Sequence, residues 1–179
     1  MKKILLIASF VISASVASAQ NASQSYISKF KDNAIRIMHE SGVPASIVLA
    51  IAMHESGSGT SKLARTQNNH FGVKGRSPVS YTGRKATHSA YKQYDSAFDS
   101  FQDFARIMTE RKQFSHLTEK FTHYDYLGWV KGIQHSGYAS SKKWGSQVLG
   151  LIRKYNLNAY DEKPEDQPQQ QQQPAKNVE

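Results

Sequence analysis

Glu55 is the side chain in this sequence that is best placed to do chemistry. It comes just after an apolar stretch, residues 47–53, and Ser-Gly-Ser-Gly at 56–59 follows it at once. Apolar surroundings favour the neutral form of a carboxyl group, which can then act as a general acid. Glycines in turn let a ligand come close to the backbone. Position alone does not establish the role, because a glutamate near a helix end is usually a solvated surface residue.

The segments around Glu55 form a motif together with a block much further along the chain. The first part reads AIAMHESG at 50–57, GTS at 59–61, LA at 63–64 and NNHFGVK at 68–74, and GYA follows at 137–139. These blocks resemble the catalytic core of the bacterial glucosaminidase family, the lysozyme-like peptidoglycan hydrolases of autolysins and flagellar rod-cap proteins. The resemblance covers about residues 25–160. It implies an α+β, mainly helical, lysozyme-like fold with a small β-lobe beside an active-site groove.

The resemblance also implies an activity and a set of site residues. The implied enzyme is an endo-β-N-acetylglucosaminidase that hydrolyses β-1,4 bonds in peptidoglycan glycan strands, with Glu55 as the general acid. Tyr138 corresponds to a family position near the catalytic centre, although it could equally be a buried tyrosine that joins two helices. The residues expected to bind the sugar are Asn69, Phe71, Tyr91 and Tyr94, of which Phe71 could equally belong to the core. The alternatives are a muramidase or lytic transglycosylase of related fold, or a non-catalytic peptidoglycan-binding or scaffold protein.

A second catalytic carboxylate is missing from the expected place. No Asp or Glu lies between Glu55 and Asp95. Asp95 is the nearest candidate, but its position before a helix favours N-capping. The base or nucleophile is therefore unassigned, and a sugar's own 2-acetamido carbonyl could attack the anomeric carbon instead. His54 adjoins Glu55, but neighbours on a helix point about 100° apart, so we expect a structural or surface role for it.

The sequence contains no motif that indicates another kind of catalysis. The seven histidines are scattered and contain no HExxH pair, the chain has no cysteine, and no G-x-S-x-G elbow is present. We therefore expect neither a metal nor a cofactor.

The two ends of the chain differ in composition from the middle. Residues 1–19 carry Lys2 and Lys3, an apolar run and an A-x-A site, which indicates a cleaved secretory signal that is too short for a stable membrane span. Residues 161–179 are acidic and Gln-rich and are expected to be disordered. The folded domain is then 20–160, exported to the periplasm or outside, and no other segment is expected to span a membrane.

The balance of charge points to an anionic partner. The formal net charge is +9, and the acidic tail makes the remaining part of the chain still more basic. Export separates the protein from nucleic acid, whereas peptidoglycan carries carboxylates in the same compartment. We expect a monomer that acts on peptidoglycan.

Hydrophobic periodicity places the motif on elements. The helix expected at 44–55 is apolar nearly all round, which is typical of a buried core helix. Between 71 and 94 the pattern favours a short β-hairpin instead. Further helices are expected at 25–40, at 61–65, after Ser96, from Asp125 to Ser136, and from Ser141 to Tyr155.

Overall fold

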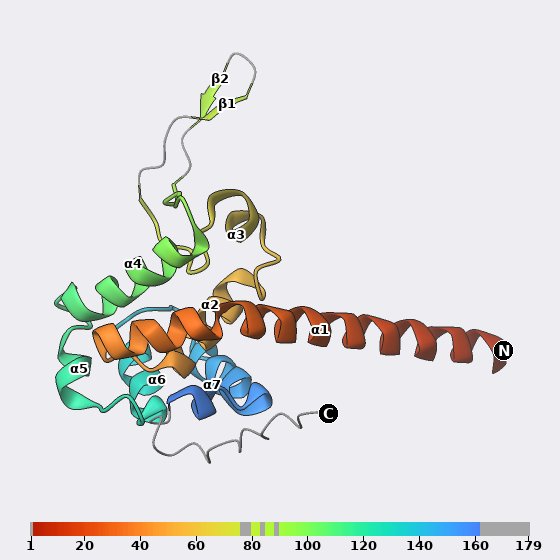
Figure 1. Ribbon diagram of the computed structural model, residues 1–179. Helices are drawn as coiled ribbons and strands as arrows, with labels where there is room; N and C mark the ends of the chain where they lie inside the picture. The colour runs from red at the N-terminus through yellow and green to blue at the C-terminus, as the bar shows by residue number, and fades with distance from the viewer. Residues whose placement is uncertain (1, 76–79, 83–84, 88–89, 162–179) are drawn as a thin grey trace, which may run out of the picture.

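The computed structural model describes residues 2–75, 80–82, 85–87 and 90–161 and is mainly helical, as predicted (Figure 1). The elements are α1 (Lys2–Ser41), α2 (Ala45–Ser56), α3 (Lys62–Gln67), β1 (Ser80–Thr82), β2 (Lys85–Thr87), α4 (Ala97–Glu110), α5 (His116–Lys120), α6 (Tyr126–His135), α7 (Trp144–Tyr155) and the 3-10 helix η1 (Leu157–Asp161).

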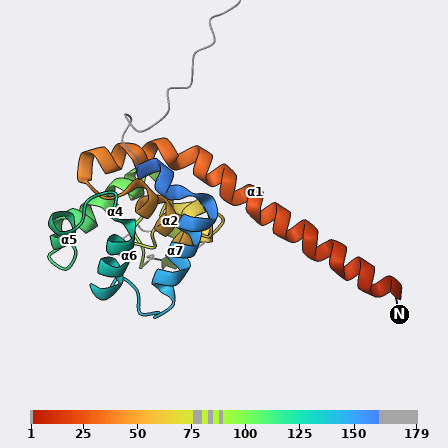
Figure 2. The ribbon, with the colours of Figure 1, turned by 90° about the horizontal axis from the view of Figure 1, so that it is seen from below.

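Helix α2 is the centre of the fold. It packs against α1, α4, α6, α7 and η1, and Figures 1 and 2 show it enclosed by them. Every residue from 45 to 53 is at most 2% exposed, which confirms the buried helix that the all-round apolar pattern predicted. Pro44 stands one residue before the helix, as its N-cap. Such complete burial requires that both ends of α2 find hydrogen-bond partners inside the protein.

A residue from the far end of the chain caps the N-terminus of α2. Asp161 Oδ1 accepts a hydrogen bond from Ser46 N at 2.8 Å, and Oδ2 accepts one from the Ser46 hydroxyl. Asp161 is 2% exposed and belongs to η1, so the folded part of the chain includes it rather than ending at residue 160. Burial raises the pKa of its carboxyl to about 6, although the hydrogen bonds from Ser46 oppose the shift.

Helix α1, which includes the helix expected at 25–40, covers one side of α2 with an apolar stripe. Its six members are all buried: Tyr26, Ile27, Phe30, Ala34, Ile37 and Met38. The helix starts at Lys2 rather than near residue 25, and its first half runs away from the helical body (Figure 2). Cleavage of residues 1–19 stays a prediction. Among the described residues, no helix is both long and apolar enough to cross a membrane.

The strand region joins the body through a short paired base. Strands β1 and β2 are antiparallel, with Ser80 opposite Thr87. Nearer the body, Lys74 forms an antiparallel bridge with Tyr91, and Lys92 N donates to Val73 O at 2.9 Å. The predicted β-lobe falls partly on residues 76–79, 83–84 and 88–89, which lie outside the described part of the chain.

The start of α4 corrects one expectation. Its N-cap is Ser96, whose hydroxyl accepts from Asp99 N at 3.2 Å, while the Asp99 carboxylate accepts from Ser96 N at 2.9 Å. This reciprocal capping box satisfies the helix end without Asp95. Asp95 is exposed one residue earlier, so N-capping was the wrong role for it. The short helix α5 was also not expected, since five residues are too few for a periodic pattern.

The cap of α2 makes stability depend on pH in a definite direction. The pKa of Asp161 is about 6 in the folded protein against 3.8 for the unperturbed group, so the folded state holds its proton more tightly. Its contribution to the free energy of unfolding is therefore complete below about pH 4 and is lost as the pH rises through about 6. Asp161→Asn cannot ionise. Relative to wild type, its free energy of unfolding should rise by roughly 2–3 kcal/mol between pH 4 and pH 7.

Urea unfolding at several pH values measures this difference, with Asp32→Asn on the exposed face of α1 as the matched control. A stability difference for Asp161→Asn that does not change with pH would contradict the account.

Candidate active site

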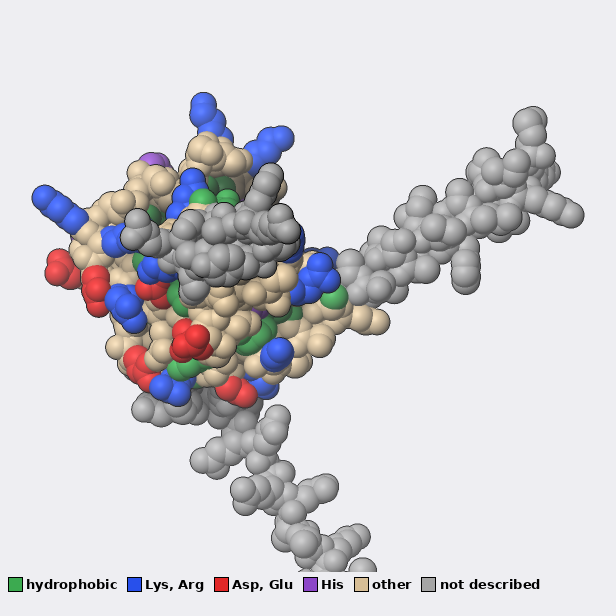
Figure 3. Space-filling model, turned by 90° about the horizontal axis from the view of Figure 1, so that it is seen from above, with side chains coloured by type: hydrophobic (Ala, Val, Ile, Leu, Met, Phe, Trp, Pro, Cys, Tyr) green, Lys and Arg blue, Asp and Glu red, His purple; other side chains and the backbone are tan. Residues whose placement is uncertain are grey.

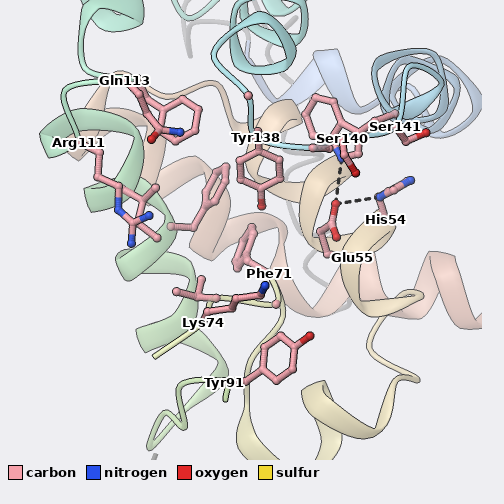
Figure 4. A pocket seen from close by; sticks show the side chains of 18 of the residues that line it. His54, Glu55, Phe71, Lys74, Tyr91, Arg111, Gln113, Tyr138, Ser140 and Ser141 are labelled. Carbon is pink, nitrogen blue, oxygen red and sulfur yellow. Dashed lines mark hydrogen bonds and ion pairs between the residues drawn. The ribbon is translucent and has the colours of Figure 1, made fainter. Parts of the chain in front are cut away.

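A groove of about 680 Å³ opens at the C-terminal end of α2 (Figure 4). Its walls come from α2, the turn after α3, Tyr91, the end of α4 with the loop that follows, and the segment leading into α7. The lining residues that matter most are His54, Glu55, Phe71, Lys74, Tyr91, Arg111, Gln113, Tyr138 and Trp144. The structure thus brings the two sequence blocks of the motif, around Glu55 and around Tyr138, to one groove.

The backbone after Glu55 turns sharply and leaves its side chain at the mouth of the core. Gly57, Ser58 and Gly59 all have left-handed backbone angles, with φ of 58°, 53° and 79°. The Ser56 hydroxyl accepts from Gly59 N at 2.8 Å and fixes this loop. A Cβ at position 59 would lie 3.0 Å from the Tyr26 ring, so a larger residue there would push the loop away from α1.

Two ring nitrogens hold one oxygen of the Glu55 carboxyl group. Trp144 Nε1 donates to Oε1 at 2.9 Å, and His54 Nδ1 lies 3.0 Å from the same atom (Figure 4). The Glu55 side chain is 27% exposed, so apolar burial is less complete than the sequence suggested. Among the described residues, Oε2 has no hydrogen-bond partner, which leaves it available to a ligand in the groove.

His54 contacts Glu55, contrary to the sequence expectation. Its Nε2 lies 3.2 Å from Gln147 Oε1, so the imidazole spans the gap between α7 and the carboxyl group. His54 and Glu55 leave the helix in different directions, but their side chains are long enough to bend back and meet. They do so beside Trp144, whose ring centre lies 6.4 Å from that of the His54 imidazole.

Tyr138 lies on the wall of the groove, packed among aromatic rings. Its ring centre is 5.2 Å from that of Trp144 and 6.2 Å from that of Phe104. Figure 4 shows the hydroxyl directed into the groove, beside Glu55 and Phe71. Burial, and then the negative charge of Glu55, hold the pKa of this phenol well above its ordinary value. Tyr138 therefore keeps its O–H and can donate a hydrogen bond at any physiological pH.

Phe71 serves the core and the groove together. It is 4% exposed and stacks on Phe104, with ring centres 4.3 Å apart and planes 8° apart. It also lines the groove, so it forms part of the floor.

Asn69 lies outside the groove lining and ties the turn together. Its Oδ1 accepts from Val73 N at 3.0 Å, while its Nδ2 donates to Val73 O at 3.0 Å and to Lys92 O at 2.9 Å. The side chain is 1% exposed. These bonds place Phe71 against the core and hold the base of the strand region.

Of the other residues proposed from sequence, one lines the groove and two do not. Tyr91 lines the groove and is 36% exposed, as a stacking surface needs to be. Tyr94 does not line it, because its hydroxyl donates to Asp103 Oδ2 at 2.7 Å, away from the groove. The Asp103 carboxylate and burial raise the pKa of Tyr94, with burial the larger cause. Asp95 is exposed and also lies outside the lining.

Sequence reasoning missed Trp144 and Gln147 as site residues. Both lie on α7, about ninety residues after Glu55, and Trp144 belongs to the apolar face of an amphipathic helix. Such a tryptophan is normally core, so no local signal distinguishes it.

Known proteins resemble this chain over most of its length. Residues 31–157 match the family model described as mannosyl-glycoprotein endo-beta-N-acetylglucosaminidase. The exo-glucosaminidase LytG of Bacillus subtilis is 28% identical over 154 residues, which are 78% of this chain and 54% of LytG. The autolysin of Enterococcus faecalis is 27% identical over 177 residues, covering 84% of this chain and 23% of that protein. The chain therefore spans about half, or less, of the length of these curated relatives.

Solved structures show the same fold. The catalytic domain of the autolysin Auto from Listeria monocytogenes superposes with a TM-score of 0.64 at 23% identity, covering 78% of this chain and 87% of that one. This likeness agrees with the helical, lysozyme-like architecture that the motif predicted.

The hydrogen bonds of Asn69 predict a structural role that can be measured. Asn69→Ala removes three bonds and takes the partner of Val73 N and of Lys92 O, while Val73 O still accepts from Lys92 N. The free energy of unfolding should fall by about 2–4 kcal/mol. Denaturant unfolding measures the loss, with Asn21→Ala on the exposed surface of α1 as the control. Equal stability of the two variants would show that these bonds do not hold the turn.

Proposed function

The chain belongs to the glucosaminidase family, and on that premise we propose that it is an N-acetylglucosaminidase that hydrolyses β-1,4 bonds in the glycan strands of bacterial peptidoglycan. The observation that carries the proposal is the Glu55 carboxyl group in the groove, with Oε1 held by two ring nitrogens. Family members named as a glucosaminidase and as an autolysin support the substrate class. The signal-like residues 1–19 support export to the cell wall.

Glu55 is the general acid in this proposal. Cleavage of a glycosidic bond needs a proton on the leaving oxygen while positive charge develops at the anomeric carbon. Glu55 gives that proton from Oε2, the carboxyl oxygen that has no hydrogen-bond partner in the described part of the chain. As the C–O bond breaks, the new carboxylate is stabilised by the Trp144 N–H at Oε1. His54 is a positioning residue, because it contacts Glu55 and Gln147 rather than the groove centre.

No second carboxylate lines the groove among the described residues. The segments of the strand region outside the description contain no Asp or Glu either, because their residues are Arg, Ser, Pro, Val, Gly and His. These observations support substrate assistance. The acetamido carbonyl oxygen attacks the anomeric carbon as the leaving oxygen takes the Glu55 proton, and water then opens the oxazolinium ion with net retention of configuration. The Tyr138 hydroxyl orients the acetamido group.

We also propose that the enzyme cleaves bonds within the strand, as an endo-enzyme. The relative LytG is instead named an exo-enzyme. The two modes differ in products. Digestion of long glycan strands should release fragments of many lengths early in the reaction. Early release of one small product alone would identify exo action instead.

Glu55→Gln tests the acid. The amide has nearly the same shape but cannot deliver an acidic proton, so kcat should fall about a hundredfold to ten-thousandfold. Hydrolysis of purified peptidoglycan is the assay, and Glu119→Gln on the exposed side of α5 is the control. A Glu55→Gln protein with near wild-type activity would remove Glu55 from this role.

The contacts of the two rings with Oε1 predict that loss of one ring lowers kcat without changing KM. His54→Leu removes the imidazole beside Oε1 and should lower kcat about tenfold, the value of one hydrogen bond to a charged group, with little change in KM. Gln147→Leu keeps the imidazole in place and should cost less. An increase of KM with kcat unchanged would mean that His54 contacts substrate instead.

Tyr138→Phe and Asp95→Asn together test how the anomeric carbon is attacked. Loss of the Tyr138 hydroxyl should lower kcat more than it weakens binding, whereas Asp95→Asn should fold and act as wild type. Proton NMR of the first-formed product should show the retained anomer. Inversion, or a folded but inactive Asp95→Asn enzyme, would rule out substrate assistance.

A further inference from the structure

Charge is divided unevenly along the groove. Among the described residues that line it, Glu55 is the one acidic side chain, and Lys74 and Arg111 carry the fixed positive charges. Figure 4 shows both cations on the side of the groove away from His54, with Phe71 and Tyr138 between them and Glu55. A ligand that spans the groove therefore meets the acid at one end and positive charge at the other.

These two cations differ from others nearby because neither has a carboxylate partner among the described residues. Lys92 Nζ lies 2.8 Å from Asp103 Oδ2, and Arg106 Nη1 lies 3.7 Å from Oδ1 of the same carboxylate. Within the described part of the chain, no carboxylate lies within ion-pair distance of Lys74 or Arg111. The space-filling view shows a related pattern, with Lys and Arg projecting along the upper edge and most Asp and Glu gathered towards the lower edge (Figure 3).

The backbones that carry the two cations are held in place. Lys74 pairs with Tyr91 at the base of the strand region. Arg111 closes α4, and its N–H donates to Ile107 O at 3.3 Å. Charged groups on a fixed backbone at a groove wall can select a ligand, since less order has to be created when the ligand binds.

We propose that Lys74 and Arg111 bind carboxylates carried by the glycan, and that they select acid-bearing strands over neutral polymers of N-acetylglucosamine. This inference rests on the proposed function for the identity of the glycan. A planar guanidinium can hold a carboxylate through two parallel hydrogen bonds, and an ammonium adds a point charge beside it. In peptidoglycan the carboxylates stand on the peptide that is attached to muramic acid or, where the peptide is absent, on the free lactyl ether, and a chitin-type oligomer has neither.

Binding measured in the full chain carrying Glu55→Gln separates recognition from cleavage. Three ligands are compared by calorimetry: glycan fragments with their peptides, the same fragments stripped of peptide so that the lactyl carboxylate remains, and a neutral N-acetylglucosamine oligomer of equal length. Lys74→Gln and Arg111→Gln are each added to this background. Lys112→Gln is the matched control, because Lys112 is exposed, adjacent in sequence and outside the groove lining.

Each groove substitution should weaken binding of the acid-bearing ligands by about three- to tenfold, as expected for a partly exposed charged hydrogen bond, and leave the neutral oligomer unaffected. Added salt should reproduce the same selective loss. An effect on the peptide-bearing ligand alone assigns the carboxylate to the peptide, an effect on the stripped ligand alone assigns it to the lactyl group, and an effect on both shows that the cations accept either carboxylate. Equal weakening for all three ligands, or none beyond that of Lys112→Gln, would overturn the inference.

Failure of the proposed function would look different. Continued cleavage by the Glu55→Gln protein would count against the acid but not against the cations, and the three ligands would then be compared by KM. Failure to bind any of the glycans would overturn both the function and the inference.

Discussion

The burial of α2 on all sides is the constraint on which the rest of the structure depends. A helix with no exposed face has to be enclosed by neighbours, and the groups at its two ends need partners inside the protein. At the N-terminal end the partner is Asp161, more than a hundred residues away. At the C-terminal end a run of left-handed residues, 57–59, turns the chain and leaves Glu55 at the edge of the core. A deeply buried element of the fold thereby presents the proposed general acid.

The groove divides its tasks among separate parts of the chain. Helix α7 supplies Trp144 and Gln147, which hold the carboxyl group and the imidazole beside it. The segment before α7 supplies Tyr138, while the turn fixed by Asn69 supplies the aromatic floor. A single carboxyl group backed by fixed donors is suited to proton delivery, and in the proposed mechanism the acetamido group of the sugar supplies the second reacting group.

The helical fold and the place of Glu55 at the edge of the core could be predicted because both rest on local patterns. The all-round apolar helix, the stripe on α1 and the motif at Glu55 can each be recognised within about thirty residues. The contacts made by Trp144, His54 and Asp161 could not be predicted, since each depends on how distant helices pack. Asn69 was placed in the groove from its position in the motif, but its amide satisfies buried backbone groups instead.

Identification of the new reducing end in digested peptidoglycan tests the central claim most directly. Purified strands would be treated with the protein, reduced, and analysed by mass spectrometry. An N-acetylglucosaminidase leaves N-acetylglucosamine at each new reducing end, and this is the result that the account predicts. A reducing muramic acid end, or a 1,6-anhydro-muramic acid end, would show that the other glycosidic bond is cut and would contradict it.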